Sequence, residues 1–232
     1  MSGFTFKQFH VEHGNSTMKV GTDAVLLGAW AEVGEGTTVL EIGCGCGVIS
    51  LMLAQRFNCS ITAIDIDKAS VDEANINFSK VNFACAPKAF VADVREYAPC
   101  HCFDLIVSNP PFFSEALLPP SQRRAAARNC QLLPFADLIK NSVRLMSAKA
   151  AFQVIIPTSE VGKFLVETTK KGLNLVRRKD IVTKPGKTPK RTMLHFVNYS
   201  LDVPILYNEL ILSNADGSRS DAYKELCREF YL

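Results

Sequence analysis

The sequence predicts an α/β protein built on a doubly wound, mainly parallel sheet of seven strands. Short apolar runs alternate with longer segments of helical periodicity, which is typical of this class. A glycine-rich turn follows the first buried run, and polar side chains stand where several of the runs end. Residues 1–232 are expected to form one domain, because this length is ordinary for a single α/β domain.

The expected strands are the apolar runs at residues 39–42, 61–65, 88–91, 104–107, 151–156, 175–178 and 193–200. The expected helices lie at residues 24–31, 48–57, 68–80, 134–146, 159–171 and from about residue 220 onward. Asp23 is expected to cap the first of these helices. Residues 4–22 mix aromatic and basic side chains and are expected to form a strand-rich lid within an N-terminal segment of about residues 1–35.

The first strand leads into a motif with one acid and three glycines, Glu41-x-Gly43-x-Gly45-x-Gly47, called the glycine motif below. Glycines permit a tight turn and close approach of a ligand, and the following helix would offer unpaired N–H groups. The glycines fall at i, i+2 and i+4, whereas a dinucleotide-binding fingerprint has them at i, i+2 and i+5. The acid favours a cationic ligand over a pyrophosphate, although a tight surface turn is the simpler alternative.

Two further acids stand at strand ends. Asp65 ends the second expected strand, at the position where doubly wound folds place a carboxylate that binds ribose hydroxyls. Asp93 follows the third expected strand. Because the carboxyl ends of parallel strands share one edge of the sheet, these acids and the glycine motif are expected to lie together.

The fourth expected strand ends in Asn109-Pro110-Pro111-Phe112. The two prolines stop the strand and leave nearby carbonyl groups outside the ladder, where they can accept hydrogen bonds from a ligand. Asn109 adds an amide oxygen, and Phe112 adds an aromatic plane. This set suits a planar amino group, which needs acceptors for its hydrogens and a surface for stacking. Taken alone, the motif is equally consistent with a turn that buries a phenylalanine.

The glycine motif, Asp65 and the Asn-Pro-Pro-Phe motif, in this order, resemble class I S-adenosylmethionine-dependent methyltransferases that act on amino groups. Residues 4–9 and 18–30 resemble the family of bacterial tRNA(Val) adenine-N6 methyltransferases, which modify the adenosine just 3′ of the anticodon. Residues 223–226 and 230–232 also resemble that family. The resemblance implies a Rossmann-like fold and a tRNA substrate.

The resemblance also implies a role for each motif residue. The residues expected to bind S-adenosylmethionine are Glu41, Gly43, Gly45, Gly47, Asp65, Asp93 and Asn109. Within this set, Glu41 would lie near the methionine end of the cofactor and Asp93 near its adenine amino group. The residues expected to act in catalysis are Asn109, Pro110 and Phe112, and Pro111 and Phe112 are expected to bind the substrate.

Positive charge is concentrated in residues 163–191, which hold ten Lys or Arg residues against two acids in a chain of net charge +3. A basic strip on a mildly acidic body favours a polyanionic partner, with a solvated helix and loop as the alternative. RNA is preferred to duplex DNA because no helix-turn-helix or other groove-reading motif is present. The basic residues expected to contact the substrate are Arg123, Arg124, Arg177, Arg178 and Lys179.

The cysteine pattern and the apolar runs bear on metal binding and on the cellular location of the protein. The eight cysteines form no Cys-x-x-Cys pair, so no metal is expected. The longest apolar run, residues 24–31, is too short for a membrane span, and no signal peptide is evident, so we expect a cytoplasmic monomer with free thiols. His10 and His13 receive no role.

Two other functions remain open from the residues alone. The same amino-directed chemistry could act on a guanine amino group of ribosomal RNA or on a glutamine side chain of a protein. A non-catalytic RNA-binding module with the same fold is the third possibility. The presence of the complete glycine motif, Asp65 and Asn109 argues against a non-catalytic module, because such a module needs none of them.

Overall fold

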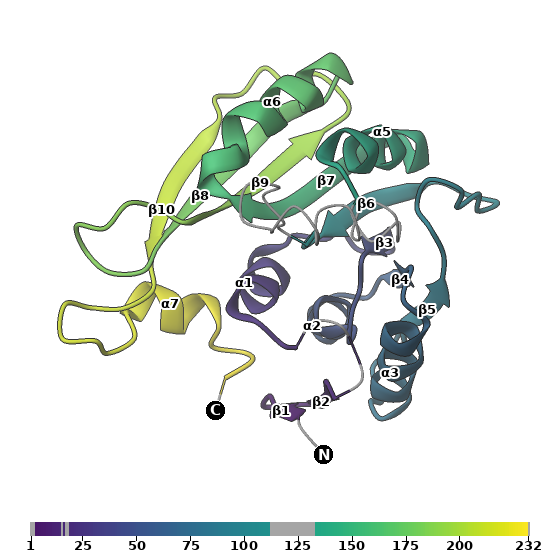
Figure 1. The fold of residues 1–232 in the computed structure, drawn as a ribbon, viewed down its shortest axis with the longest axis horizontal. Coiled ribbons are helices and arrows are strands. Elements are labelled where there is room, and N and C mark those ends of the chain that lie inside the picture. Colours follow the sequence, from purple (N-terminus) through teal and green to yellow (C-terminus); the bar gives the residue numbers. More distant parts are fainter. Residues whose placement is uncertain (1–2, 15, 17–18, 112–132, 232) are drawn as a thin grey trace, which may run out of the picture.

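The computed structural model describes residues 3–14, 16, 19–111 and 133–231. Within these residues one large sheet holds eight strands (Figure 1). Their order across the sheet is β10 (Leu206–Ile211), β8 (Asn174–Val182), β9 (Arg191–Val197), β7 (Met146–Pro157), β6 (Phe103–Ser108), β3 (Thr38–Ile42), β4 (Ser60–Asp65) and β5 (Lys88–Val91). Strand β9 is antiparallel to both of its neighbours, and the other seven strands point the same way. The mainly parallel α/β sheet is therefore confirmed.

Helices cover both faces of this sheet, as a doubly wound fold requires (Figure 1). One face packs against α1 (Thr22–Trp30), α2 (Val48–Arg56), α3 (Lys68–Ser79) and α7 (Asp221–Leu226). The other face packs against α5 (Phe135–Leu145) and α6 (Val161–Lys170), and a short 3-10 turn, Thr158–Glu160, precedes α6.

Side-chain alternation along the central strands divides the core into two halves. In β3, Val39 contributes to the half under α1 and α2, whereas Leu40 and Ile42 contribute to the half under α5 and α6. All three side chains are buried, so each contributes about 1.5–3 kcal/mol of hydrophobic stabilisation. Burial on both faces explains why these strands have continuous apolar sequences.

An aromatic hairpin precedes the sheet. Strands β1 (Gly3–Thr5) and β2 (His10–Glu12) pair antiparallel, which agrees with the strands expected in this segment. Phe6 stacks on Phe9 with ring centroids 4.6 Å apart and also contacts Phe230 edge-on. These contacts pack the two ends of the chain against each other.

Two details differ from the sequence-based expectation. Strand β10 adds an eighth strand where none was predicted, because four of its six residues are exposed and it lacks an apolar pattern. The expected cap of α1 by Asp23 is wrong. The N-cap residue is Gly21, which makes no side-chain cap hydrogen bond, and the Asp23 carboxylate instead accepts a 2.7 Å hydrogen bond from the Arg191 guanidinium. None of the helices in the described residues is long and apolar enough to cross a membrane.

The turn between β3 and α2 provides a test of this packing. Gly47 has a φ of +80°, and a Cβ atom placed there would lie 2.5 Å from the Phe78 ring of α3. Gly172 has a similar φ of +75° with no atom within 4 Å of its Cβ position. We predict that Gly47→Ala lowers the free energy of unfolding by ~1–3 kcal/mol more than Gly172→Ala does, because only the former adds a clash to the backbone strain. Chemical denaturation of both variants measures this difference, and equal losses would contradict the packing described here.

Candidate active site

The predicted site residues from four strands meet at one edge of the sheet. Ile42 of β3 lies opposite Ile64 of β4 and Ser108 of β6 in the strand register. Asp65 of β4 lies opposite Val91 of β5. The glycine motif, Asp65, Asp93 and Asn109 therefore follow neighbouring strands at their carboxyl ends, where open α/β sheets bind their ligands.

The backbone of the glycine motif is hydrogen-bonded to β4 on one side and leaves open space on the side of the Gly43 Cβ position. The N–H groups of Gly43 and Cys44 donate to the Ile64 carbonyl at 2.8 and 3.1 Å, so the turn is tied to β4. Gly43 has a φ of +74°, and a Cβ atom at this position would have no heavy atom within 4 Å. The space above Gly43 is thus free for close approach of a ligand.

Asp65 joins the turn after β4 to the glycine motif. One carboxylate oxygen accepts from Gly45 N and the other from Asp67 N, each at 2.9 Å. Burial raises the pKa of Asp65, although these two hydrogen bonds oppose the shift. Each oxygen retains further acceptor capacity, which fits a carboxylate that receives ligand hydroxyl groups.

Glu41 lies beneath the glycine motif, with a side chain that is 1% exposed. Its Oε2 accepts a 3.0 Å hydrogen bond from Ser50 N and a second hydrogen bond from Ser50 Oγ. Burial raises the pKa of Glu41 to about 8, and the Ser50 hydrogen bonds offset only part of that effect. The direct contacts of Glu41 thus connect the end of β3 to the first turn of α2.

Asp93 is paired within its own turn. Its carboxylate accepts from the Arg95 backbone N–H at 2.9 Å and from the Arg95 guanidinium. The Arg95 hydrogen bonds lower the pKa of Asp93, so the group is an anion at neutral pH. Any role toward a cofactor would be shared with this arginine.

Asn109 carries an unpaired polar atom at the end of β6. Its Oδ1 is buried and has no hydrogen-bond partner in the described structure. Ser108 Oγ donates to the Ile42 carbonyl at 2.8 Å and so fixes the end of β6 beside β3. Pro110 is buried and Pro111 is half-buried. An unpaired buried acceptor costs about 1–3 kcal/mol, and a ligand that donates a hydrogen bond to Asn109 Oδ1 would recover that cost.

Three of the predicted substrate-binding residues, Phe112, Arg123 and Arg124, lie outside the described residues. The three predicted from β8 are half-buried on that strand. Arg177 forms an ion pair with Glu32 at 2.5 Å and stacks over the Trp30 ring at 4.6 Å. Arg178 pairs with Asp180 at 2.8 Å.

These internal contacts favour structural roles for Arg177 and Arg178. Of the three β8 residues, Lys179 alone is without a carboxylate partner in the described structure, and burial lowers its pKa. The expectation that these residues contact RNA stays a prediction.

Two functional candidates on α3 were missed. Asn77 is fully buried, and its Nδ2 donates to both Cys46 O and Glu12 O at 2.9 Å. Glu73 is also buried and accepts from the backbone N–H groups of Gly14 and Ser16. The pattern that could have revealed them is their i, i+4 spacing within the apolar stripe of the helix.

The donor and acceptor groups at this edge fit an adenosine-like cofactor beside a planar amino group. The open space at Gly43, the spare acceptor capacity of Asp65 and the unpaired Asn109 Oδ1 all favour such ligands. In the described part of the chain, no group of three or more His, Cys, Asp or Glu residues could hold a metal ion.

Comparison with known proteins resolves the family. A curated relative from Phocaeicola vulgatus, named tRNA1(Val) (adenine(37)-N6)-methyltransferase, is 41% identical over 234 residues, which cover 99% of this chain and 97% of the relative. This chain belongs to that methyltransferase family. A relative of the same name from Pseudoalteromonas translucida is 34% identical and covers 100% of this chain and 99% of its own length. The family model described as methyltransferase small domain matches residues 13–122.

Solved structures support the class I methyltransferase fold. A predicted O-methyltransferase from Agrobacterium tumefaciens superposes with a TM-score of 0.71 at 16% identity, covering 90% of this chain and 96% of its own. The N-methyltransferase NodS from Bradyrhizobium japonicum, solved with S-adenosyl-L-homocysteine, has a TM-score of 0.54 at 17% identity, covering 75% and 84%. S-adenosyl-L-homocysteine is what remains of S-adenosylmethionine after methyl transfer. Its presence in the NodS structure is consistent with the S-adenosylmethionine expected from the sequence.

The raised pKa of Glu41 predicts how the stability of this methyltransferase depends on pH. A carboxyl group whose pKa rises from 4.5 to about 8 on folding binds more protons in the native state, so stability falls as pH increases through this window. Glu41→Gln removes the ionisation and should flatten the melting temperature profile of the cofactor-free protein between pH 5 and 8. Glu35→Gln, an exposed charge-matched control, should keep the wild-type profile. Identical profiles for wild type and Glu41→Gln would show that Glu41 does not titrate in this window.

Proposed function

We propose that the protein transfers the methyl group of S-adenosylmethionine to N6 of adenine 37 in tRNA1(Val). The observation that carries the proposal is the buried, unpaired Asn109 Oδ1 at the end of β6, one strand from the glycine motif. A planar amino group would supply the missing donor. The identity of the substrate comes from the family relatives, whose names specify this tRNA and this base.

The strand-end residues would hold the cofactor, which supplies an electrophilic methyl group. The backbone at Gly43, Gly45 and Gly47 would meet its amino-acid part, and Asp65 would accept from its ribose hydroxyls. Asp93 would lie near its adenine. Glu41 would act from beneath the motif, through the position of α2.

Asn109 and Pro110 would polarise the acceptor. The exocyclic nitrogen of adenine donates its lone pair into the ring and is a weak nucleophile. Hydrogen bonds from its two N–H groups to Asn109 Oδ1 and to the Pro110 carbonyl would strengthen as positive charge develops on the nitrogen. Proton loss can follow attack, so no strong base is required. Phe112 and Pro111 would hold the plane of the extruded base.

The N-terminal segment would serve as a lid beside the cofactor. Asn77 links Glu12 to Cys46 of the glycine motif, and Glu73 holds the backbone at Gly14 and Ser16. This arrangement supports one domain in which residues before β3 complete the site. We expect the protein to act on tRNA in the cytoplasm as a monomer.

The role of Asn109 can be separated from folding. Because Oδ1 makes no hydrogen bond in the described structure, Asn109→Ala should leave the melting temperature unchanged or slightly raised. Cofactor affinity measured by calorimetry should stay within a few-fold of wild type, whereas kcat should fall by about 100-fold or more. The exposed Asn82→Ala is the matched control and should behave as wild type. Near-normal turnover of Asn109→Ala would refute the proposed mechanism.

The identity of the methyl acceptor is tested by offering the candidate substrates one at a time. Purified protein and labelled methyl donor are incubated separately with unmodified tRNA, ribosomal RNA and a peptide-chain release factor. We expect incorporation into tRNA only, and nucleoside mass spectrometry should identify N6-methyladenosine at position 37. Transfer to ribosomal RNA or to the release factor, without transfer to tRNA, would replace this proposal with a guanine- or glutamine-directed activity.

A further inference from the structure

Two loops that the catalytic proposal does not use lie on the same edge of the sheet as Asn109. Strands β8 and β10 run parallel to β6, so their carboxyl ends lie at the edge where β6 ends. Residues 183–190 follow β8, and residues 212–220 follow β10. Both segments therefore flank the candidate active site along one side of the molecule (Figure 1).

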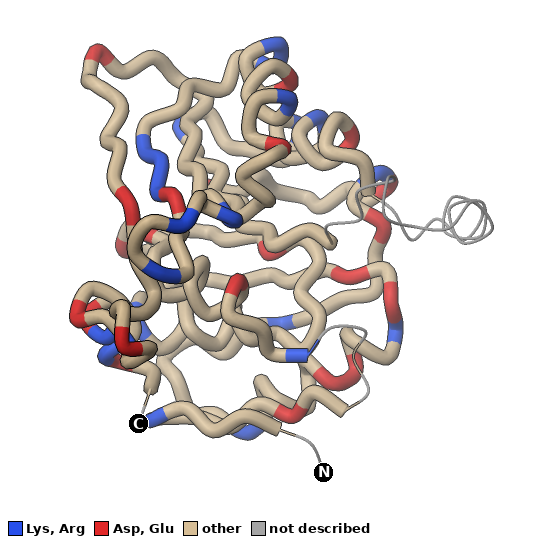
Figure 2. The backbone as a smooth tube through the Cα atoms, turned by 60° about the vertical axis from the view of Figure 1, so that its left-hand side comes forward, with Lys and Arg blue, Asp and Glu red and all other residues tan. Residues whose placement is uncertain are grey.

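The first of these segments carries concentrated positive charge. Residues 183–190 contain Lys184, Lys187 and Lys190 and no acid. All three lysines are exposed, and no ion pair or hydrogen bond of their ammonium groups occurs in the described structure. In Figure 2, blue segments mark this part of the tube beside those of β8. Arg177 and Arg178 differ because each already binds a carboxylate.

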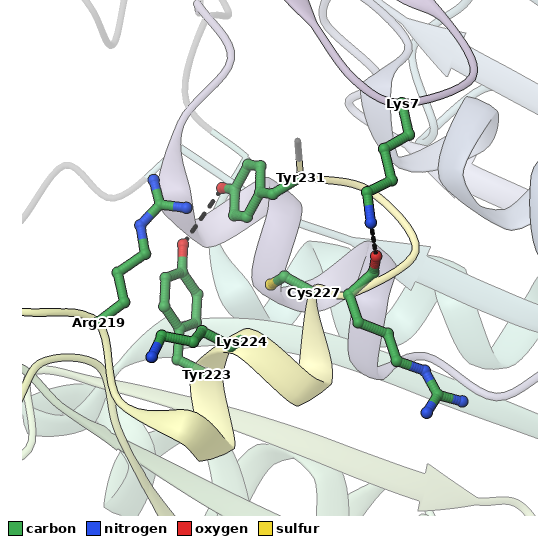
Figure 3. Close-up of a pocket in the computed structure, with 7 residues that line it drawn as sticks. Lys7, Arg219, Tyr223, Lys224, Cys227 and Tyr231 are labelled. Carbon is green, nitrogen blue, oxygen red and sulfur yellow. Dashed lines mark hydrogen bonds between the residues drawn. The ribbon is translucent and has the colours of Figure 1, made fainter.

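A basic pocket of about 260 Å³ lies between α7 and the N-terminal segment (Figure 3). Its lining includes Lys7, Arg219, Lys224 and Arg228 and no acidic side chain. The Arg219 guanidinium lies 4.7 Å from the centroid of the Tyr231 ring, which restricts the arginine without neutralising it. Lys224 and Arg228 pair with Asp221 and Glu225, so Arg219 is the arginine of this lining that has no carboxylate partner in the described structure.

The loop and the pocket adjoin each other. Lys184 Nζ lies 3.8 Å from the Cβ position of Gly217, and Ser213 forms a β-bridge with Arg219. We call the set Lys184, Lys187, Lys190 and Arg219 the basic edge surface. Two acids lie nearby. Asp221 pairs with Lys224, whereas Asp216 accepts from Ser218, and these hydrogen bonds together with the charge of Lys184 lower the pKa of Asp216.

The separation of this surface from the reactive site limits what it can contact. The loop of residues 183–190 joins β8 to β9, which lie three and two strand intervals from β6, and β10 lies four intervals away. At ~4.8 Å per interval, the surface therefore spans roughly 10–19 Å from β6. A base held at Asn109 could not cover this span. The phosphate groups of the flanking RNA could, and phosphates are the groups that clustered Lys and Arg side chains recognise.

We propose that the basic edge surface binds the phosphate backbone of the substrate RNA at a distance of roughly 10–20 Å from the methylated base. This inference rests on the proposed function, because it assumes that an RNA base enters at Asn109. It implies that the enzyme recognises folded RNA beyond the loop that carries the target. Short RNA fragments would then be methylated but would bind without this contribution.

The test compares two charge-reversed variants. The first is Lys184→Glu/Lys187→Glu/Lys190→Glu. The control is Lys149→Glu/Lys170→Glu/Lys171→Glu, which makes the same charge change at exposed positions on the opposite edge, where β7 begins and α6 ends. Substrates are full-length unmodified tRNA and a single-stranded oligonucleotide carrying only the anticodon-loop sequence. Melting temperature and S-adenosylmethionine affinity are measured for both variants.

For full-length tRNA we expect the first variant to raise KM at least tenfold while kcat changes little. The slope of a plot of log K for tRNA binding against log salt concentration should be less steep by about two to three. Each lost phosphate contact reduces the magnitude of this slope by about 0.7–0.9. KM for the oligonucleotide and affinity for the cofactor should match wild type. Arg219→Gln should raise KM for tRNA in the same direction. The control variant should retain wild-type KM for tRNA.

If both triple variants raised KM for tRNA equally, the effect would reflect only general attraction between charges, and the proposal would be overturned. An unchanged KM of the first variant would also overturn it. If the melting temperature of the first variant is lower than that of wild type, the variant with all three lysines changed to Gln replaces it and is judged by the same criteria. Filter binding of tRNA without the methyl donor keeps this test independent of catalysis. Wild-type protein that binds tRNA through this surface but methylates no RNA would instead refute the proposed function.

Discussion

The candidate site depends on one tight contact, between the turn after β3 and helix α3. At Gly47 the backbone adopts a left-handed conformation in a space that the Phe78 ring leaves too small for any side chain. One turn position earlier, the Cys46 carbonyl accepts from Asn77, the residue before Phe78. Helix α3 therefore sets the position of the turn. With the turn placed, hydrogen bonds to Ile64 and Asp65 fix its N–H groups, and the space above Gly43 remains open.

The same contact connects the N-terminal segment to the site. Asn77 uses its side-chain amide fully: it donates to Cys46 and Glu12 carbonyls and accepts from the Glu12 N–H. A buried amide with every group satisfied specifies geometry more strictly than apolar packing does. Displacement of Glu12 would therefore disturb the Cys46 carbonyl directly, because both are held by the side chain of Asn77. This contact couples the N-terminal segment to the glycine motif.

The sequence was informative where structure follows from local pattern. Buried parallel strands appear as continuous apolar runs, so the strand ends and the residues that follow them, from Glu41 to Asn109, could be placed on one edge. Pairings between distant residues could not be placed. Asp23 looked like a helix cap but binds Arg191, and Arg177 looked free but binds Glu32. Half-exposed β10 has no apolar alternation, so its sequence did not distinguish it from a loop.

The buried Asn109 oxygen shows why stability alone does not explain this sequence. A small apolar residue at that position would avoid the desolvation of an unpaired acceptor, which costs about 1–3 kcal/mol. The surrounding structure instead keeps the oxygen buried, between the buried Pro110 and Ser108 in sequence, and Ser108 donates to the Ile42 carbonyl. A buried acceptor interacts more strongly with developing positive charge than one in water, because less solvent must reorganise. The features that make this group unfavourable in the free protein are therefore those that would make it effective toward an amino group during methyl transfer.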